Sequence, residues 1–102
     1  MDGYLMIHYY RIKSDRRDEY LQIMKIIREH IRKMDLSYYG LFEDEREKNC
    51  FKEVFVFDSH LSYEMRKRSD MSVETEKAYN KLNDLIEGGY DDVETEFSDQ
   101  IY

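Results

Sequence analysis

The sequence predicts one α+β domain in which helices cover one face of a four-stranded antiparallel sheet, the ferredoxin-like split β-α-β arrangement. Three observations predict it. The chain has 102 residues, the size of a single domain. It has no proline and only four glycines, so we expect regular elements with short connections. Aromatic and β-branched runs alternate with stretches of helical period in the order β-α-β-β-α-α-β.

Residues 3–12 predict the first strand, because they are aromatic and β-branched and show no helical period. One side of this strand carries Tyr4, Met6, His8, Tyr10 and Ile12, and the other carries Leu5, Ile7, Tyr9 and Arg11. Since both sides are largely apolar, we expect the strand to be buried on both faces.

The next stretch predicts a helix over residues 15–34, with Ser14 or Asp15 as its N-cap. Its apolar residues recur at helical spacing and form one stripe along roughly four turns. The stripe contains Tyr20, Ile23, Met24, Ile27, Ile31 and Met34.

Residues 36–44 and 51–57 predict two further strands joined by a polar turn over residues 45–49, which makes a hairpin. Asp58 or Ser59 then opens a helical region from Leu61 to Arg68, and a break at Ser69-Asp70 follows.

Ser72 is the predicted cap of a further helix, which ends at Gly88-Gly89. Its predicted buried residues are Ala78, Leu82, Leu85 and Ile86, with Tyr79 at the edge. Residues 91–97 alternate acidic with less polar side chains and predict a half-exposed edge strand.

The apolar pattern of the strands also predicts a partner. Helices cover one sheet face only, yet the first three strands carry apolar residues on both sides. We therefore expect a homodimer packed sheet to sheet. The sequence does not decide which face lies toward the helices.

Composition and charge restrict the function classes. The net charge is −7, which argues against nucleic acid or an anionic membrane as the main partner. No apolar run approaches the ~20 residues of a membrane span. The opening Met1-Asp2-Gly3-Tyr4 lacks the pattern of a signal peptide, so a cytoplasmic protein is expected.

Cysteine and histidine usage predicts no metal site. Cys50 is the single cysteine, and the three histidines are widely separated without metal-ligand spacing. No glycine-rich phosphate loop is present, and we expect no cofactor. Cys50 lies near Lys48 and Lys52, which would lower its pKa slightly, but no base accompanies it.

Four stretches agree in order and spacing with a known group of proteins. They are Tyr10-Arg11-Ile12, Gly40-Leu41-Phe42-Glu43-Asp44, Phe51-Lys52-Glu53-Val54-Phe55-Val56 running on to Ser59, and the helical region from Glu64 to Tyr79. On these, the sequence resembles the dimeric α+β barrel superfamily, which includes the antibiotic-biosynthesis-monooxygenase-like domains. Its nearest resemblance is to the barrel-like domain found alone or at the C-terminus of some enterobactin-exporter-like major facilitator transporters. The resemblance implies one dimeric α+β barrel domain over residues 1–102.

The chain also departs from these groups. The exporter subgroup carries a tryptophan just after the Ser59 position and histidines in the following helix, where this chain has His60, Tyr63 and Lys67. Heme-degrading members use a first-strand asparagine, a tryptophan and a helix histidine; here there is no tryptophan, and Tyr79 lies near the histidine position. Heme chemistry is therefore not implied, while the cofactor-independent quinol and anthrone oxygenases stay open.

His8 and Glu53 are the main catalytic candidates. In a cavity, the neutral imidazole of His8 would act as a base toward a phenolic substrate; the other interpretation is a hydrogen-bonded core histidine. Glu53 lies between two phenylalanines, where burial raises the pKa of a carboxyl group, and it would serve as a proton acceptor or ligand anchor. Its other interpretation is a structural pair with Arg11 or a tyrosine hydroxyl.

Aromatic residues supply the remaining candidates. Tyr10 is the third catalytic candidate, and the predicted ligand-binding residues are Tyr38, Tyr39, Phe55, His60 and Tyr63. Such residues also serve as core or as dimer interface.

The leading hypothesis is a small-molecule-binding or cofactor-independent monooxygenase-like domain acting on a hydrophobic aromatic compound. Its alternative is a non-enzymatic regulatory module of the same fold that binds a ligand or a protein. In a third interpretation, the aromatic residues serve dimer packing and no pocket exists.

Overall fold

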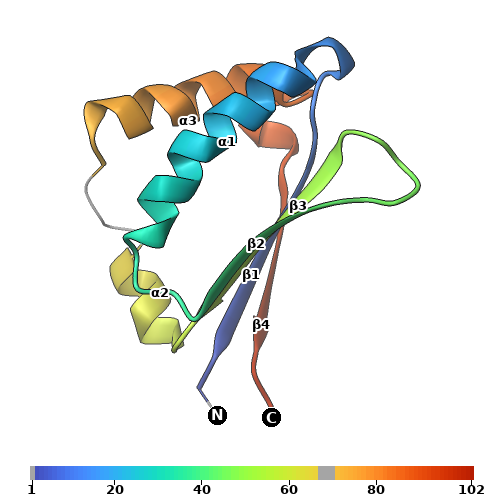
Figure 1. The fold of residues 1–102 in the computed structure, drawn as a ribbon. Helices are drawn as coiled ribbons and strands as arrows, with labels where there is room; N and C mark the ends of the chain where they lie inside the picture. Colours follow the sequence, from blue (N-terminus) through green and yellow to red (C-terminus); the bar gives the residue numbers. More distant parts are fainter. Residues whose placement is uncertain (1, 67–70) are drawn as a thin grey trace.

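The computed structural model describes residues 2–66 and 71–102. A four-stranded sheet lies against helices on one face only (Figure 1). The strands are β1 (Tyr4–Arg11), β2 (Tyr38–Glu43), β3 (Cys50–Phe57) and β4 (Glu94–Asp99). The helices are α1 (Arg17–Arg32), α2 (His60–Arg66) and α3 (Val73–Leu85), with short 3-10 turns η1 (Ser14–Arg16) and η2 (Gly89–Asp92).

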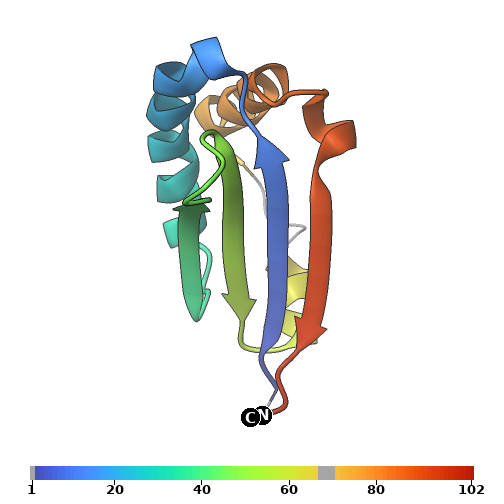
Figure 2. The same ribbon diagram turned by 90° about the vertical axis from the view of Figure 1, so that its right-hand side faces the viewer.

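The sheet order is β2-β3-β1-β4, and each neighbouring pair is antiparallel (Figure 2). This is the topology of the ferredoxin-like split β-α-β arrangement, so the predicted fold class is confirmed. The two crossovers, through α1 and through α2–α3, place all three helices on the same side of the sheet (Figure 1).

The strand alternation settles which face carries the helices. His8 and Tyr10 of β1 and Glu53 and Phe55 of β3 point to the helix side, where the buried core lies. The predicted stripe of α1 packs onto this face, and its five members within the helix are buried: Tyr20, Ile23, Met24, Ile27 and Ile31. The sequence pattern therefore placed the core of α1 correctly.

No helix covers the opposite, open face of the sheet in the described part of the chain (Figure 2). Its centre is apolar and half-buried by neighbouring side chains alone, and it consists of Leu5, Ile7, Val54 and Val56, with the more exposed Tyr38 and Phe42 beside them.

Two helix starts test the capping predictions. Ser72 caps α3 as predicted, and its Oγ accepts a hydrogen bond from the backbone N–H of Thr75 at 3.1 Å. The predicted cap at Ser14 or Asp15 is wrong. The chain instead enters α1 through the 3-10 turn η1, and neither turn nor helix has a side-chain cap.

The last strand begins later than predicted. The predicted helix end at Gly88-Gly89 is wrong, because α3 already ends at Leu85 and Ile86 is extended. Gly88 and Gly89, with φ of +78° and +68°, instead form the left-handed start of η2. The chain then makes η2, which takes up Asp91 and Asp92, so β4 begins at Glu94 rather than at residue 91. β4 lies at the edge of the sheet as predicted, but all of its residues are exposed, not only those on one side.

The predicted end of the second helical region at residues 67–68 and the predicted break at Ser69-Asp70 lie outside the described residues. No helix in the described ranges has the length and apolar character needed to cross a membrane.

Candidate functional site

A cavity of about 290 Å³ lies on the helix side of the sheet, between β1, β3, β4, α3 and η2. Its lining residues are His8, Tyr10, Glu53, Tyr79, Leu82, Ile86, Tyr90, Val93 and Thr95. All three residues predicted to be catalytic line this one cavity. His8 is paired in register with Glu53 of β3 on one side and with Thr95 of β4 on the other, so these three residues are neighbours in the cavity wall.

Glu53 is held by tyrosine hydroxyls. Its side chain is buried, with 5% of the residue exposed. The Tyr10 hydroxyl donates to Oε1 at 2.8 Å, and the Tyr39 hydroxyl donates to Oε2 at 2.8 Å. The Tyr20 hydroxyl lies 2.7 Å from that of Tyr10 and can donate to it, so all the donors run toward the carboxylate.

The electrostatics of this network follow from burial. Burial raises the pKa of the Glu53 carboxyl group, while the hydrogen bonds from Tyr10 and Tyr39 oppose that rise. Burial also raises the pKa of the Tyr10, Tyr20 and Tyr39 hydroxyls, and the nearby charge of Glu53 adds to the rise. These hydroxyls therefore stay protonated and act as donors.

The sequence suggested Arg11 or a tyrosine hydroxyl as the structural partner of Glu53, and the structure shows tyrosine hydroxyls bonded to it. Arg11 is instead half-exposed and forms ion pairs with Glu47 and Glu87. Among the described residues, no Lys or Arg forms an ion pair with Glu53.

His8 is fixed by its neighbours on β4 and β3. Its Nδ1 lies 2.9 Å from the Thr95 Oγ1, and its ring meets the Phe55 ring edge-on with centroids 5.5 Å apart. Burial lowers the pKa of the imidazole, so the ring is neutral at neutral pH. When Nδ1 carries the hydrogen, it donates to Thr95 and leaves Nε2 as the basic nitrogen.

Two of the tyrosines that line the cavity were missed by sequence reasoning. Tyr79 was placed at the edge of its helix, and Tyr90 follows the glycine pair with no pattern of its own. The Tyr90 hydroxyl donates to the Tyr79 backbone carbonyl, and its backbone N–H donates to the Asn83 Oδ1 at 2.7 Å. Burial raises the pKa of Tyr90 to about 12. For Tyr79, the available signals were its one-residue offset from the buried Ala78 and its place near the histidine position of the heme-degrading members.

The predicted ligand-binding residues lie in three different parts of the structure. Phe55 packs on His8, and Tyr39 reaches Glu53 from the α1 side. Tyr38 lies one residue away on β2, so alternation places it on the open face and away from the cavity. His60 and Tyr63 belong to α2 and contact Tyr4 of β1 in another aromatic cluster, and neither lines the cavity.

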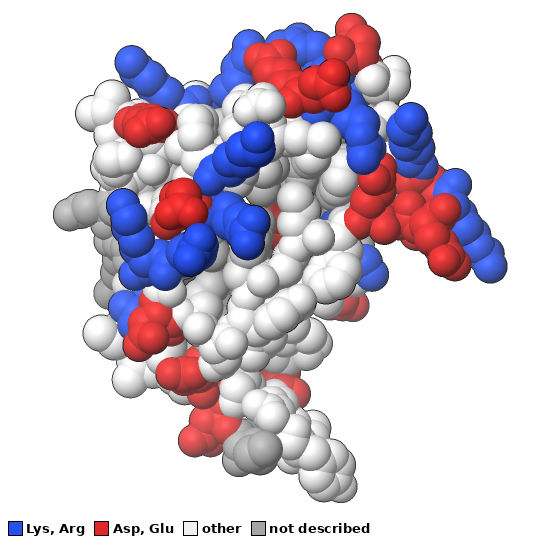
Figure 3. Space-filling view, viewed as in Figure 1, with Lys and Arg blue, Asp and Glu red and all other residues white. Residues whose placement is uncertain are grey.

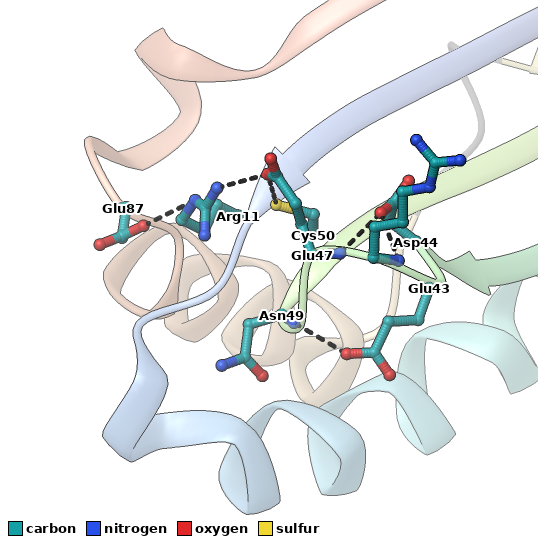
Figure 4. A network of polar contacts seen from close by, with 8 residues as sticks. Arg11, Glu43, Asp44, Glu47, Asn49, Cys50 and Glu87 are labelled. Atoms are coloured by element: carbon teal, nitrogen blue, oxygen red, sulfur yellow. Dashed lines mark hydrogen bonds and ion pairs between the residues drawn. The ribbon is translucent and has the colours of Figure 1, made fainter.

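A second polar network stabilises the β2–β3 hairpin (Figure 4). Arg11 bonds Glu47 at 2.8 Å, and Glu47 also accepts from the Cys50 thiol. Burial and this carboxylate raise the pKa of Cys50, so the predicted lowering by neighbouring lysines is wrong. The thiol is therefore protonated and not activated as a nucleophile.

The same hairpin is bound to α1 by an ion pair. The Arg17 Nη2 lies 2.7 Å from the Glu43 Oε1, and the backbone N–H of Asn49 donates to the Glu43 Oε2 at 2.8 Å. These bonds lower the pKa of Glu43 to about 2. The network accounts for the left-handed turn at Asn49 and is structural.

Within residues 2–66 and 71–102, no three His, Cys, Asp or Glu side chains are grouped so that they could hold a metal ion.

Comparison with solved structures places the fold among antibiotic-biosynthesis-monooxygenase-like proteins. One similar structure is SnoaB, a cofactor-independent oxygenase from Streptomyces nogalater, with a TM-score of 0.77 and 9% identity over 100% of this chain and 96% of that one. Another, an antibiotic biosynthesis monooxygenase, has a TM-score of 0.76 and 16% identity over 97% and 99%. A conserved protein from Methanosarcina mazei gives 0.79 and 14% over 96% and 92%. No family model matches the sequence, and no curated protein does.

Proposed function

We propose that this chain is a monooxygenase-like domain that binds a small hydrophobic aromatic compound in the cavity beside His8 and oxidises it without a metal or flavin. The observation that carries the proposal is the meeting of a neutral histidine and a buried carboxylate in one tyrosine-lined cavity. The fold of the cofactor-independent oxygenase SnoaB is consistent with it.

In this proposal His8 is the base and Glu53 and Tyr10 orient the substrate. A base and a dry cavity are sufficient, because a deprotonated phenol or anthrone is electron-rich enough to react with oxygen directly. For an anthrone, His8 removes a proton from the ring CH2 group and the carbanion reduces O2. One oxygen atom becomes the new ketone, and the other leaves as water with both hydrogens of the CH2 group.

The open face supports a homodimer as part of this proposal. Four apolar residues at the centre of this face lie on β1 and β3, and Tyr38 and Phe42 extend the patch along β2. An uncovered apolar sheet face of this kind is typical of a protein interface.

The resemblance to the exporter-appended domain and the cytoplasmic location remain predictions.

The non-enzymatic module is the second candidate, and one observation favours it. Both oxygens of Glu53 are already bonded to tyrosine hydroxyls, so the carboxylate also has a purely structural explanation.

Oxygen consumption with an anthrone distinguishes the two candidates. We expect the protein to raise the rate above the protein-free background and His8→Phe to abolish the increase, because phenylalanine cannot accept a proton. Tyr38→Phe is the matched control and should keep the full rate, since Tyr38 lies on the other face. Circular dichroism checks that each variant folds. An unchanged rate in folded His8→Phe, or no rate above background with quinols and anthrones, would favour the module.

A further inference from the structure

The wall of the cavity contains an acidic side chain in addition to its aromatic rings. Glu53 is its one carboxylate, and each of its oxygens accepts one hydrogen bond in the described structure. A carboxylate has about four acceptor positions, so each oxygen keeps the capacity to accept a further hydrogen bond. No Lys or Arg among the described residues forms an ion pair with Glu53.

Positive side chains are concentrated elsewhere. Figure 3 shows Lys and Arg side chains gathered over α1, which carries Arg17, Lys25, Arg28 and Arg32. The described residues that line the cavity include no Lys and no Arg, and the one histidine among them is neutral because burial lowers its pKa. Of the charged residue types, only an acid therefore faces the cavity.

Three tyrosine rings form part of the wall around this carboxylate. Tyr10 comes from β1, Tyr79 from α3 and Tyr90 from η2, so they approach from three different elements. The faces of such rings attract cations, and the attraction grows when the cation is removed from water. Burial raises the pKa of all three hydroxyls, and the charge of Glu53 adds to each rise.

A buried carboxylate among aromatic rings is the chemistry that selects an organic ammonium group. A cation placed here gains the attraction of Glu53 and of the rings, and it offsets the cost of burying an unpaired negative charge. An anionic ligand would instead meet Glu53 with no positive group to balance it.

We propose that the ligand of this cavity is an aromatic compound carrying a protonated amine, with the ammonium group bound by Glu53 and the rings of Tyr10, Tyr79 and Tyr90. This inference rests on the proposed ligand-binding role of the cavity and adds the chemical class of the ligand. The volume of about 290 Å³ restricts the ligand to a small molecule.

Three probes of nearly equal size test the charge preference: the phenethylammonium ion, neutral 2-phenylethanol and the phenylacetate anion. Their affinities are measured by isothermal titration calorimetry at neutral pH and low salt. We expect the ammonium probe to bind tighter than the alcohol by about tenfold or more, and phenylacetate to bind weakest.

Two pairs of variants locate the preference. Glu53→Gln should remove most of the ratio between the ammonium and alcohol affinities, whereas Glu74→Gln, an equal charge change at an exposed site on α3, should leave that ratio unchanged. Tyr90→Leu should weaken the ammonium probe several-fold, and Tyr90→Phe, which keeps the ring, should restore it.

The outcomes separate this inference from the function on which it rests. Equal binding of the three probes, or an ammonium preference that survives in Glu53→Gln, would overturn the inference and leave the cavity as a neutral aromatic site. Equal losses in Glu53→Gln and Glu74→Gln would assign the preference to net charge and also overturn it. Absence of saturable binding by all three probes would refute both the ligand class and the cavity as a site for small aromatics.

Discussion

Tyr39→Phe tests the hydroxyl network around Glu53 with the loss of a single oxygen atom. In the native protein the Tyr39 hydroxyl donates to the Glu53 Oε2 at 2.8 Å, and both residues lie in or against the core. Phenylalanine keeps the ring and its contact with Phe55 but leaves one oxygen of a buried carboxylate without its donor.

The expected cost depends on the charge of Glu53. Hydrogen bonds to charged groups contribute about 1.5–3 kcal/mol, and neutral ones about 0.5–1.5 kcal/mol. Burial raises the Glu53 pKa, so the larger cost appears only above that raised pKa and declines to the smaller one as the carboxyl group is protonated. For a domain near 100 residues, each kcal/mol corresponds to roughly 4–8 °C in Tm.

Urea unfolding of the two proteins over a pH series measures this cost. Tyr38→Phe is the control, because Tyr38 is 47% exposed on the open face and makes no hydrogen bond through its hydroxyl to any described residue. Its cost should stay within about 0.5 kcal/mol at every pH. Equal costs for the two variants, or a Tyr39→Phe cost that is larger at acid pH, would refute the account of Glu53.

Three further predictions follow from the same structure. Burial raises the Glu53 pKa above its ordinary 4.5, so the folded state keeps this proton to a higher pH than the unfolded state does. The contribution of Glu53 to the free energy of unfolding is therefore fully present below pH 4.5 and falls as the pH rises toward the raised pKa. Urea unfolding of Glu53→Gln should therefore show a gain relative to wild type as pH rises, and a constant difference would contradict the raised pKa. Ile27→Ala, at a residue with 0% exposure, should lose about 2–5 kcal/mol in the same assay, and a loss below about 1 kcal/mol would show that the α1 stripe is not core. Val54→Asp, at the centre of the open face, should convert a dimer to a monomer in sedimentation equilibrium, whereas an unchanged mass would exclude this face as the interface.

The fold was predictable because its periodic patterns are long. The apolar stripe of α1 defines its helix without help from distant residues, whereas the glycine pair marks the turn η2 and not the end of α3. The start of β4 was not predictable in this way, because the 3-10 turn η2 carries the same acidic residues that suggested a strand.

The candidate site was predictable in part. Strand alternation placed His8 and Tyr10 on one side of the first strand, but the pairing of β1 with β3 that brings Glu53 beside them comes only from the structure. Tyr38 and Tyr39 look alike in the sequence, and only the pairing of β2 with β3 puts one against Glu53 and the other on the open face. Tyr90 depends on a turn conformation that no local pattern specifies.

Ligand-induced stabilisation tests most directly whether the cavity is a binding site. Thermal unfolding of the wild-type protein would be measured with small aromatic compounds, including quinols, anthrones and aromatic amines, and repeated with Glu53→Gln and with Tyr38→Phe. A ligand at 100 times its Kd should add about 2.7 kcal/mol to stability. We predict a saturable rise in Tm that Glu53→Gln reduces and Tyr38→Phe retains; no rise with any compound, or an equal rise in all three proteins, would contradict the account.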